Sequence, residues 1–527
     1  MRRAARARSL PFPIPILFAV AIVLASGCAS APAPAPPAAV PSHAATPRPG
    51  GALADLEAAL RAAHGPDVSG FMLLQHNGDA LAWRLALVDA ARHSLDLQYY
   101  VWFGDRSGRI LLARVVAAAD RGVKVRLLVD DLNTMLRDMT TVELRDALHV
   151  ALDAHPNIEL RVFNGWRGRG LLERVAEGAS EFTRLNRRMH NKQMIADNRA
   201  AIVGGRNIGD EYFGLNPAFN FHDLDVLAAG PVAREASAVF DRYWNSGWAG
   251  RGPRPEDAKS GAAEPVGPRS LAIAGLDAGG RTHDTPTARA AGEPRIPALA
   301  ATMHPGLGRV RADPPSRDAR SSNRVPEAFR ALMRSARREV LIVNAYVIPD
   351  TAFMADLREL AARGVSIRLL TNSLSSHDVP AVNSHYEGFR PAILATGAQL
   401  HELRADPAIQ ATLVDTPPVA SRFTGLHVKA MVVDRERAFV GSMNLDPRSE
   451  IFNSEMGVVV DSPPLARELA AARERVMSGA NSWQVSARAD GTLRWRSDAG
   501  ELARQPARSA WQRVENLFFK LFPPTLY

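Results

Sequence analysis

Two stretches of the 527-residue chain carry the same four polar residue types at the same spacing. Residues 189–207 read M-H-N-K-Q-M-I-A-D-N-R-A-A-I-V-G-G-R-N, and residues 426–444 read L-H-V-K-A-M-V-V-D-R-E-R-A-F-V-G-S-M-N. In each stretch a His is followed by Lys two residues later, Asp seven residues later and Asn seventeen residues later. The matched residues are His190, Lys192, Asp197 and Asn207 in the first copy, and His427, Lys429, Asp434 and Asn444 in the second. Agreement at four positions in two places is hard to obtain by chance.

Each copy offers an imidazole, an ammonium group and a carboxamide, and this set suits a phosphoryl group. Lys and Asn can neutralise and hydrogen-bond phosphoryl oxygens, while His can attack phosphorus or move a proton. A lone His in an apolar hairpin is usually a satisfied core residue, but two of them with matched Lys and Asn indicate a function. Three other His residues lack such neighbours and are interpreted as ordinary core or surface residues: His222, His377 and His401.

Both stretches predict a β-hairpin, with a short strand, a turn at the Asp and a second apolar strand that ends in Gly. Alternate residues of a strand share a face, so each His is expected beside its Lys. Each Asp stands an odd number of residues from its His and falls on the other face or in the turn. This parity favours structural roles for Asp197 and Asp434. The small residues before each Asn allow a substrate to approach the backbone closely.

The duplicated H-x-K-x4-D motif with its G-[GS]-x-N extension resembles the phospholipase D superfamily. The resemblance implies that both copies pack about a pseudo-twofold axis and share one active site. One His forms a phosphohistidine there, and the other protonates the leaving alcohol and then deprotonates the incoming one. In the family the His of the first copy is usually the nucleophile, which implies His190 here, although the motif itself does not decide this. The resemblance further implies a catalytic set, which is His190, Lys192, Asp197, His427, Lys429 and Asp434. It also implies a phosphate-binding set, which is Lys192, Asn207, Lys429 and Asn444. Because two Lys supply positive charge, no metal and no other cofactor is expected.

One acid follows each motif in a strand-like context, Asp223 in N-F-H-D-L-D-V-L and Glu455 in N-S-E-M-G-V-V-V. By analogy with the family, Asp223 and Glu455 are expected to orient His190 and His427, in that order, as carboxylates behind a functional imidazole do. Asp225 is an alternative to Asp223 for this role.

The pattern of strands and helices also occurs twice, which predicts an internal duplication. After residue 325 the stretch S-A-R-R-E-V-L-I-V-N-A-Y-V matches the earlier A-A-R-H-S-L-D-L-Q-Y-Y-V. In the first copy the predicted helices and strands are helix 81–91, strand 94–102, helix 108–120, strand 121–130, a helical stretch near 141–154 and strand 158–163. This order predicts an α/β fold with a mostly parallel sheet flanked by helices in each of two phospholipase D-like domains.

The length allows two or three domains, and composition suggests where they begin and end. The segment 251–324 is rich in Gly, Pro, Ala, Arg and Asp without sustained periodicity, which indicates a flexible insertion with a return to order near 310–315. The predicted divisions are a signal peptide at 1–27, an Ala/Pro-rich tether at 28–51, a first domain at 52–250, the insertion at 251–324 and a second domain at 325–527.

The N-terminus has the features of a targeting signal: basic residues, an apolar run over 14–25, and Cys28, which is the only cysteine in the chain. This segment resembles a bacterial lipoprotein signal, which implies cleavage before Cys28 and acylation that anchors the protein to a membrane. The alternative is an uncleaved helix, but the apolar run is short for spanning a bilayer. The expected location is the bacterial cell envelope, facing the periplasm, and Ala29 points to the outer membrane in a Gram-negative host.

The net charge of +9 favours anionic partners such as lipid headgroups or nucleic acid. The stretch W-Q-R-V-E-N-L-F-F-K-L-F-P-P at 511–524 predicts an amphipathic helix. Its apolar face is expected to pack on the second domain, with insertion at a membrane surface as the alternative.

Blocks such as R-L-N-R-R-M-H-N-K and V-G-G-R-N-I-G-D-E-Y-F resemble bacterial cardiolipin synthases, especially their C-type branch. The implied reaction makes cardiolipin from phosphatidylglycerol and a second phospholipid, either phosphatidylethanolamine or phosphatidylglycerol, with no nucleic acid as partner. One alternative is hydrolysis of a phospholipid or nucleic acid by the same site. Another is an inactive membrane lipoprotein, against which the intact His, Lys and Asn of both copies argue.

Overall fold

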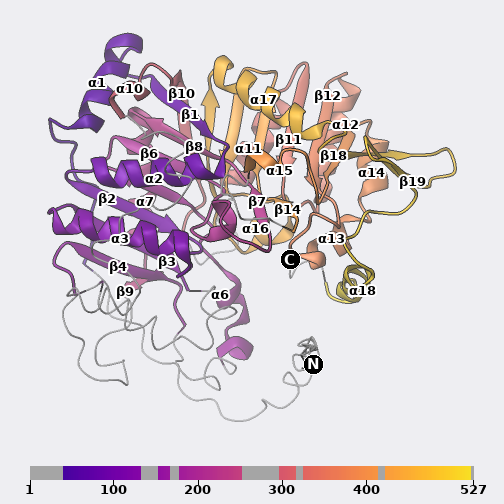
Figure 1. Cartoon of the computed structure of the whole chain (residues 1–527), viewed down its shortest axis with the longest axis horizontal. Coiled ribbons are helices and arrows are strands. Elements are labelled where there is room, and N and C mark those ends of the chain that lie inside the picture. Colours follow the sequence, from indigo (N-terminus) through magenta and orange to yellow (C-terminus); the bar gives the residue numbers. More distant parts are fainter. Residues whose placement is uncertain are drawn as a thin grey trace, which may run out of the picture.

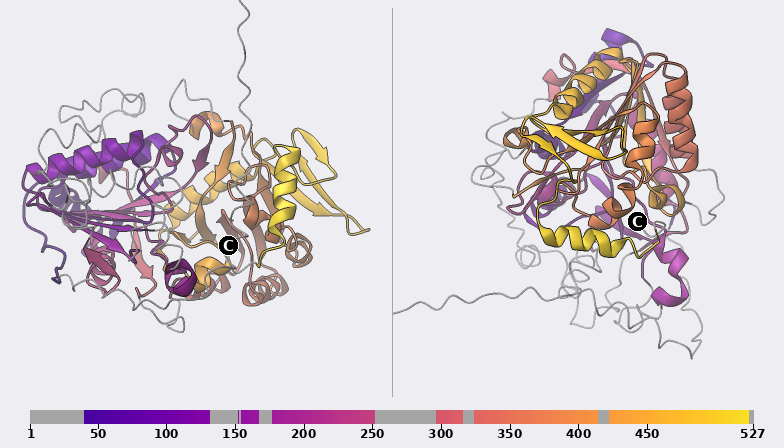
Figure 2. Two further views of the ribbon diagram at one scale, coloured as in Figure 1. Left: turned by 90° about the horizontal axis from the view of Figure 1, so that it is seen from below. Right: turned by 90° about the vertical axis from the view of Figure 1, so that its right-hand side faces the viewer.

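Two similar halves lie side by side along the long axis of the molecule (Figures 1 and 2). The computed structural model describes residues 40–131, 152, 154–166, 177–251, 296–315, 324–413 and 422–523. The signal peptide, Cys28 and most of the region 141–154 lie outside these ranges. Among the described residues, every helix is too short or too polar to span a bilayer.

The first half follows the predicted order of helices and strands. Its elements are α1 (Ala52–His64), β1 (Ser69–Leu74), α2 (Asn77–Ala90), β2 (Ser94–Tyr99), α3 (Arg106–Asp120), β3 (Lys124–Asp130), β4 (Ile158–Phe163), α6 (Phe182–Asn186), β5 (Gln193–Ala196), β6 (Ala200–Gly204), η3 (Asp210–Tyr212), β7 (Asn220–His222), β8 (Asp225–Ala229), α7 (Pro231–Trp244) and β9 (Ala249–Arg251).

The second half repeats this order, and the predicted duplication is confirmed. Its elements are α10 (Ile296–Leu299), β10 (His304–Ala312), α11 (Arg324–Arg334), β11 (Glu339–Asn344), α12 (Thr351–Ala362), β12 (Ser366–Asn372), α13 (Pro380–Tyr386), α14 (Arg390–Ala395), β13 (Gln399–Leu403), α15 (Gln410–Leu413), β14 (Thr424–Leu426), β15 (Lys429–Val433), β16 (Arg437–Gly441), α16 (Pro447–Ile451), β17 (Met456–Asp461), α17 (Pro463–Met477), β18 (Ser482–Ala487), β19 (Leu493–Ser497), β20 (Gly500–Leu502) and α18 (Ala510–Phe519).

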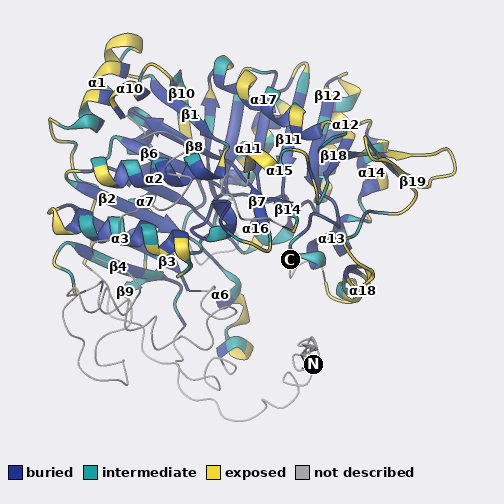
Figure 3. Ribbon diagram, in the orientation of Figure 1, coloured by how far each residue is buried: buried dark blue, intermediate teal, exposed yellow. Residues whose placement is uncertain are grey.

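Matched local signals start equivalent elements in the two halves. Asp105 caps α3 by accepting a hydrogen bond from the backbone N–H of Gly108, and Asp350 caps α12 by accepting one from the N–H of Phe353. A carboxylate at this position satisfies a backbone donor that the helix leaves unpaired. The strands before these helices, β2 and β11, are almost entirely buried, as expected for strands covered by helices on both faces (Figure 3).

The strands of both halves form one continuous mixed sheet. Their pairings give the order β9-β4-β3-β2-β5-β6-β8-β1-β10-β17-β16-β15-β11-β12-β13-β18-β19-β20. Strands β2, β3 and β4 are parallel, as are β11, β12 and β13, so the predicted parallel order holds for these. The motif strands run antiparallel to their neighbours, and the tight turn within each hairpin requires this of the pairs β5–β6 and β15–β16.

Strand β10 joins the two halves, although it lies within the predicted flexible insertion. Its first residues pair with β1, where Ser69 stands opposite Gly306, and the rest pairs with β17, where Leu307 stands opposite Asp461. The second half therefore begins before residue 325, within the predicted insertion. The Pro and Gly residues of H-P-G-L-G-R-V-R-A hide the alternation typical of a strand. The structure also describes α10 within the insertion, whereas residues 252–295 and 316–323 lie outside the described ranges.

The end of the predicted tether packs on the first half. The backbone N–H of Ser42 donates to Asn245 Oδ1 at 2.9 Å, and the Trp244 indole donates to the Ser42 hydroxyl at 2.8 Å. The N–H of Ala44 donates to the carboxylate of Asp241. From residue 40 onward, this segment is thus part of the folded body and not a free tether.

The halves also share one hydrophobic core. A single buried cluster contains Val203 and Val226 of the first half together with Val440 and Val458 of the second. The halves are therefore parts of one packed molecule, with the two motif hairpins at their junction. At the far end of the second half, α18 presents its apolar side chains to solvent, so the expected packing of that face on the second domain is wrong.

Candidate active site

Each predicted hairpin is present, with its turn at the motif Asp. Residues Asp197 and Asn198 have φ values of 51° and 57°, and Asp434 and Arg435 have values of 54° and 57°. Two successive residues with positive φ form the kind of turn whose twist matches paired antiparallel strands, and Asp and Asn tolerate this conformation. The turns therefore set the register that places each His and Lys on the same buried face.

The two Asp residues hold the backbone and do not face the His residues. Asp197 accepts hydrogen bonds from the backbone N–H groups of Arg92, His93 and Ser94. Asp434 accepts equivalent bonds from residues 337, 338 and 339 at 2.8–3.0 Å. Burial alone would raise the pKa of Asp434, but these backbone bonds outweigh burial and hold it below its usual range. The parity interpretation thus agrees with the structure, and the placing of Asp197 and Asp434 in the catalytic set does not.

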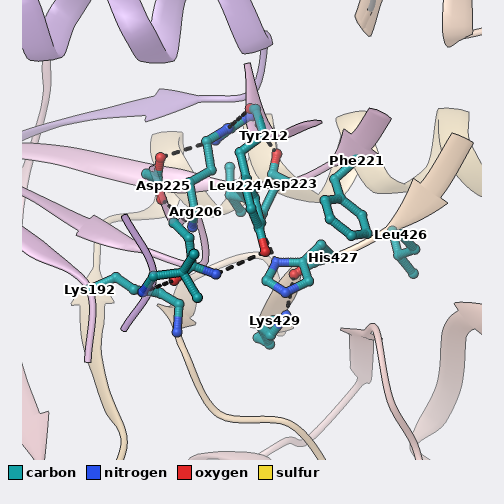
Figure 4. Close-up of polar contacts among 12 residues, drawn as sticks. Lys192, Arg206, Tyr212, Phe221, Asp223, Leu224, Asp225, Leu426, His427 and Lys429 are labelled. Atoms are coloured by element: carbon teal, nitrogen blue, oxygen red, sulfur yellow. Dashed lines mark hydrogen bonds and ion pairs between the residues drawn. The ribbon is translucent and has the colours of Figure 1, made fainter. Parts of the chain in front are cut away.

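Each imidazole is oriented by a carboxylate of the opposite half. His190 Nδ1 lies 2.8 Å from Glu455 Oε2. His427 Nδ1 lies 2.6 Å from Asp223 Oδ2, and Figure 4 shows these two residues together. The expected pairing within each half is therefore wrong, although the two acids are the predicted ones. Because each carboxylate accepts a hydrogen bond from Nδ1–H, Nε2 of each neutral ring carries a lone pair for attack or proton transfer.

Backbone pairing between the halves explains this crossed arrangement. Strand β7 runs parallel to β14, and the N–H of His427 donates to the carbonyl of His222, the residue before Asp223, at 2.8 Å. In the same way, the N–H of His190 donates to the carbonyl of Ser454, the residue before Glu455, at 2.8 Å. Each His is thus hydrogen-bonded beside the acid of the other half, and one half alone would lack its orienting group.

The two motif Lys residues are buried in the same site. Lys192 and Lys429 are each 1% exposed, and each Nζ donates to the carbonyl of the His two residues earlier at 2.6 Å. Burial lowers the pKa of Lys192 to about 7 and that of Lys429 to about 8. Each Lys also lowers the pKa of the His in the other half, so all four side chains share one electrostatic environment. Figure 4 shows Lys192 and Lys429 entering this space from strands of different halves.

The two carboxylates differ in their ionisation. Burial raises the pKa of Glu455 to about 7, and the hydroxyl of Ser442 donates to this group at 2.5 Å. Burial also opposes the charge of Asp223, but His427 and Lys429 outweigh it and keep the pKa of Asp223 below its usual range. Gly205 stands where the second copy has Ser442, and a Cβ there would lie 2.4 Å from Asp223 Oδ1. Gly205 thus leaves room for Asp223, whereas Ser442 donates a hydrogen bond to Glu455.

Both imidazoles are held in the neutral form by their surroundings. Burial and the ammonium groups of Lys192 and Lys429 hold the pKa of His190 well below its usual value. Burial, followed by Lys429, lowers the pKa of His427 to about 3, while Asp223 acts in the opposite direction. A neutral ring with Nε2 unprotonated is the form in which His is a nucleophile or a base.

The two motif Asn residues are not equivalent. The amide of Asn207 accepts a hydrogen bond from the N–H of Val101 at 3.2 Å and donates to the Tyr212 hydroxyl at 2.9 Å. It therefore ties the loop after β2 to the segment after β6, which differs from the predicted phosphate-binding role. Asn444 is 5% exposed, and its amide oxygen has no hydrogen-bond partner among the described residues. Of the two, Asn444 is the amide that remains available to a ligand.

The alternative acid, Asp225, belongs to a buried ion-pair network. It accepts hydrogen bonds from Arg84 at 2.9 Å and from Arg206 at 3.1 Å, and all three side chains are at most 1% exposed. Figure 4 shows the pair with Arg206. Its charge is thus fully engaged by two guanidinium groups. Asp223, and not Asp225, is therefore the acid that orients an imidazole.

Aromatic rings surround the two imidazoles, and sequence reasoning did not identify them. Tyr100 meets His190 edge to face with 4.9 Å between ring centroids. His427 is flanked by Phe221 at 4.9 Å, Tyr212 at 5.3 Å and Tyr346 at 6.4 Å (Figure 4). Tyr100 and Tyr346 also lie near the ammonium groups of Lys192 and Lys429, respectively. The only sequence signal was the Tyr that ends each matched strand block.

The three His residues set aside from the motif have different surroundings. His222 Nε2 lies 2.6 Å from a guanidinium nitrogen of Arg473. His401 lies on β13, and its pKa is lowered to about 4 by burial. His377 stacks on Tyr346 with 5.2 Å between ring centroids, so it supports the wall beside His427. His222, through its backbone carbonyl, and His377, through its ring, thus lie closer to the site than the sequence indicated. No cluster of three or more His, Cys, Asp or Glu arranged to hold a metal occurs among the described residues.

Comparisons with known proteins agree with the duplicated site. The family described as "Cardiolipin synthase, PLD-like domain" matches residues 85–244 and 329–477. The chain is 35% identical over 463 residues to cardiolipin synthase C of Escherichia coli K12, covering 85% of this chain and 94% of that protein. It is 25% identical over 388 residues to the major cardiolipin synthase of Bacillus subtilis 168, covering 73% of this chain and 64% of that protein. The crystal structure of phosphatidylserine synthase from Haemophilus influenzae Rd KW20 has the same fold, with a TM-score of 0.55 at 12% identity, covering 86% of this chain and 93% of that one.

Proposed function

The chain belongs to the cardiolipin synthase family of phospholipase D-like proteins, and from this we propose that it transfers a phosphatidyl group between phospholipids. The product is cardiolipin, made from phosphatidylglycerol and a second phospholipid, either phosphatidylethanolamine or phosphatidylglycerol. One observation carries the proposal: a His from each half, oriented by a carboxylate of the other half, faces a site that holds both buried Lys residues.

The surroundings of the two His residues favour His190 as the nucleophile. Lys192 and Lys429 disfavour a protonated His190, and its partner Glu455 has a raised pKa, so this ring is kept neutral. His427 faces Asp223, whose carboxylate stays ionised and favours the protonated ring once an anionic phosphodiester has bound. A proton donor needs this second environment, and an attacking nitrogen needs the first.

The proposed reaction has two balanced steps. His427 takes up a proton at Nε2 when the anionic donor lipid binds. Nε2 of His190 then attacks the phosphorus of the donor lipid, and the bond to the headgroup alcohol breaks while His427 gives this proton to the leaving oxygen. A glycerol hydroxyl of phosphatidylglycerol then gives its proton to His427 and attacks the phosphohistidine, which releases cardiolipin and restores His190. Lys192 and Lys429 neutralise the negative charge on the phosphoryl oxygens throughout.

The direct test is incubation of the purified protein with phosphatidylglycerol, with and without phosphatidylethanolamine. Cardiolipin is the expected product, and His190→Ala and His427→Ala should each abolish its formation. Phosphatidic acid as the sole product would show hydrolysis instead of transfer. Near-normal cardiolipin formation by either variant would contradict a shared active site.

We also propose that the protein is a membrane-anchored lipoprotein of the cell envelope facing the periplasm. The support is the basic N-terminus, the short apolar run and Cys28 directly after small residues. Two substrates that reside in a bilayer favour an enzyme that is held there. Replacing Cys28 by Ser should prevent incorporation of labelled palmitate into the protein, which tests acylation directly.

A further inference from the structure

Helix α18 lies on the second half by its polar side and turns its apolar side outward. Gln512 and Asn516 are 3% and 4% exposed, whereas Trp511 and Leu517 are 61% and 66% exposed. The outward side chains, which continue for one turn beyond the helix, are Trp511, Val514, Leu517, Phe518, Leu521 and Phe522. We call these six residues the apolar face of α18. This orientation is the reverse of that of an amphipathic helix that covers a protein core.

Buried hydrogen bonds fix the helix in this orientation. Gln512 Nε2 donates to the carbonyl of Leu374 at 2.5 Å, and Asn516 Nδ2 donates to Glu387 at 2.9 Å. The carboxamide oxygen of Asn516 accepts a bond from Asn383 at 2.7 Å. Rotating the helix to bury its apolar face would leave these polar groups unpaired, and buried polar groups without partners are costly. These hydrogen bonds therefore keep the apolar face of α18 exposed in the folded protein.

The chemistry of this face fits the interface of a lipid bilayer. A contiguous exposed group of Trp, Leu, Phe and Val side chains marks an interaction surface, and Trp and Phe beside cationic residues are typical of helices in the interfacial plane. Arg513 and Lys520 lie on the flank of the helix, and both line an adjacent cavity of about 710 Å³, together with Arg390, Arg504 and one acid, Glu387. Lys520 pairs with Glu387, and Arg390 pairs with the buried Glu402, so among the described residues Arg504 and Arg513 are the cations of this cavity that remain to meet anionic headgroups.

The same element is tied to the wall of the active site. Arg508, just before α18, donates to the carbonyls of Ser375 at 2.5 Å and His377 at 3.1 Å. His377 stacks on Tyr346, which lies beside His427 and over Lys429. In Figures 1 and 2, α18 lies beside α13 on the outside of the second half. A bilayer in contact with α18 would therefore also lie close to the loop that supports the catalytic wall.

We propose that the apolar face of α18 inserts into the interfacial region of an anionic bilayer and holds the second half with its catalytic wall against the lipid. This inference deepens the proposed function, because it rests on substrates that reside in a bilayer. Contact through α18 is separate from the N-terminal anchor: the anchor tethers the chain, whereas α18 sets the orientation of the active site.

A site-specific fluorophore tests insertion in the full chain. Cys28 is the only cysteine, so a Cys28→Ser background accepts an environment-sensitive label at Leu517→Cys. The matched control is Leu307→Cys, because Leu307 is 54% exposed on β10, away from α18. With phosphatidylglycerol-containing vesicles, the label at 517 should shift to shorter wavelength and the label at 307 should not. An unchanged label at 517 on vesicle-bound protein would overturn insertion, and an equal shift with pure phosphatidylcholine would overturn the preference for anionic lipid. A shift that depends on protein concentration without vesicles would identify a second copy as the occupant and overturn the proposal.

Kinetics separate this inference from the proposed function. The double variant Leu517→Asp/Phe518→Asp should form cardiolipin on vesicles at least about tenfold more slowly, since a loss of about 1.4 kcal/mol in binding gives this factor. It should keep its rate on short-chain phosphatidylglycerol below the micellar concentration, and Leu307→Asp should keep both rates. Equal loss on both substrates would overturn an orienting role. Absence of transfer by the unmodified protein on either substrate would defeat the proposed function, while the fluorescence result would still report on α18.

Discussion

His190 and His427 each depend on a carboxylate that the other half of the chain provides. The two arrangements look alike but differ in chemistry, because the charge of Asp223 is stabilised by its neighbours whereas burial raises the pKa of Glu455 to about 7. This difference supports the division of labour between an attacking nitrogen and a proton-transferring one. At the scale of single residues, the active site is thus asymmetric despite the duplication.

Replacing Asp223 by Asn should lower the turnover number about 10- to 100-fold, the usual effect of losing a group that orients a functional imidazole. Cardiolipin formation under saturating lipid measures this. Asp225→Asn is an unsuitable control because Asp225 pairs with two Arg residues. The exposed Asp67 serves instead, and Asp67→Asn should leave the rate unchanged. Equal rates for Asp223→Asn and the control would contradict the crossed arrangement.

The rate should fall as pH rises through the pKa values of the motif Lys residues. An amine is charged below its pKa, so the stabilising charge is present at lower pH and is lost as pH rises through about 7 to 8 in the free enzyme. The pH profile of kcat/KM, which reports on the free enzyme, should therefore have a descending limb in this range. In Lys192→Arg the limb should move to higher pH, toward the pKa of Lys429, since Arg keeps its charge. A profile identical to that of the unmodified protein would show that Lys192 does not control this limb.

At the scale of elements, each motif is a hairpin whose turn Asp ties it to a neighbouring strand. Asp197 binds the backbone at the start of β2, and Asp434 does the same at the start of β11. The His and Lys of each hairpin therefore occupy fixed positions relative to the parallel strands. The Asp of each motif therefore has a structural role, which is to hold the catalytic His and Lys in position.

Asp434→Asn should destabilise the fold more than it slows the reaction. The neutral amide cannot accept all the backbone bonds of the carboxylate, and the loss of charged hydrogen bonds costs about 1.5–3 kcal/mol. Urea unfolding at pH 7 measures the free energy of unfolding, with Asp67→Asn as the matched control. Because the pKa of Asp434 is lowered in the fold, its stabilisation is present at neutral pH and lost as pH falls through that lowered pKa. Loss of turnover without loss of stability would show that Asp434 has a catalytic role.

At the scale of the whole molecule, the halves are joined by a strand, by backbone pairing at the site and by a common core. Strand β10 pairs with β1 and with β17, and β7 pairs with β14. The shared core places Val203 and Val226 in the same cluster as Val440 and Val458. The assembled site is therefore inseparable from the packing of the two halves.

The described body should unfold in one cooperative transition. Because the two halves share a core, Val440→Ala should lower the temperature of that transition without splitting it, at a cost of about 1–3 kcal/mol. Differential scanning calorimetry measures this. Two separate transitions, with only one displaced by Val440→Ala, would show that the halves are independent.

The sequence by itself determined the chemistry and the repeated elements. Residue types and their spacing indicated both His–Lys pairs and both hairpins, because strand periodicity and turn chemistry are local properties. The resemblance to the phospholipase D superfamily pointed to the two orienting acids. The match between the blocks before each motif likewise revealed the duplication. The structural role of Asp197 and Asp434 followed from parity along a strand.

Only the tertiary structure decided which acid serves which His, that Asn207 is engaged in the fold, that β10 joins the sheet and that α18 faces outward. Each of these depends on pairing between segments far apart in the chain. The crossed carboxylates follow from β7 meeting β14 and from Ser454 meeting His190, and the orientation of α18 follows from the partners of Gln512 and Asn516. Local periodicity describes which side chains share a face, but contacts with the rest of the molecule decide what that face meets.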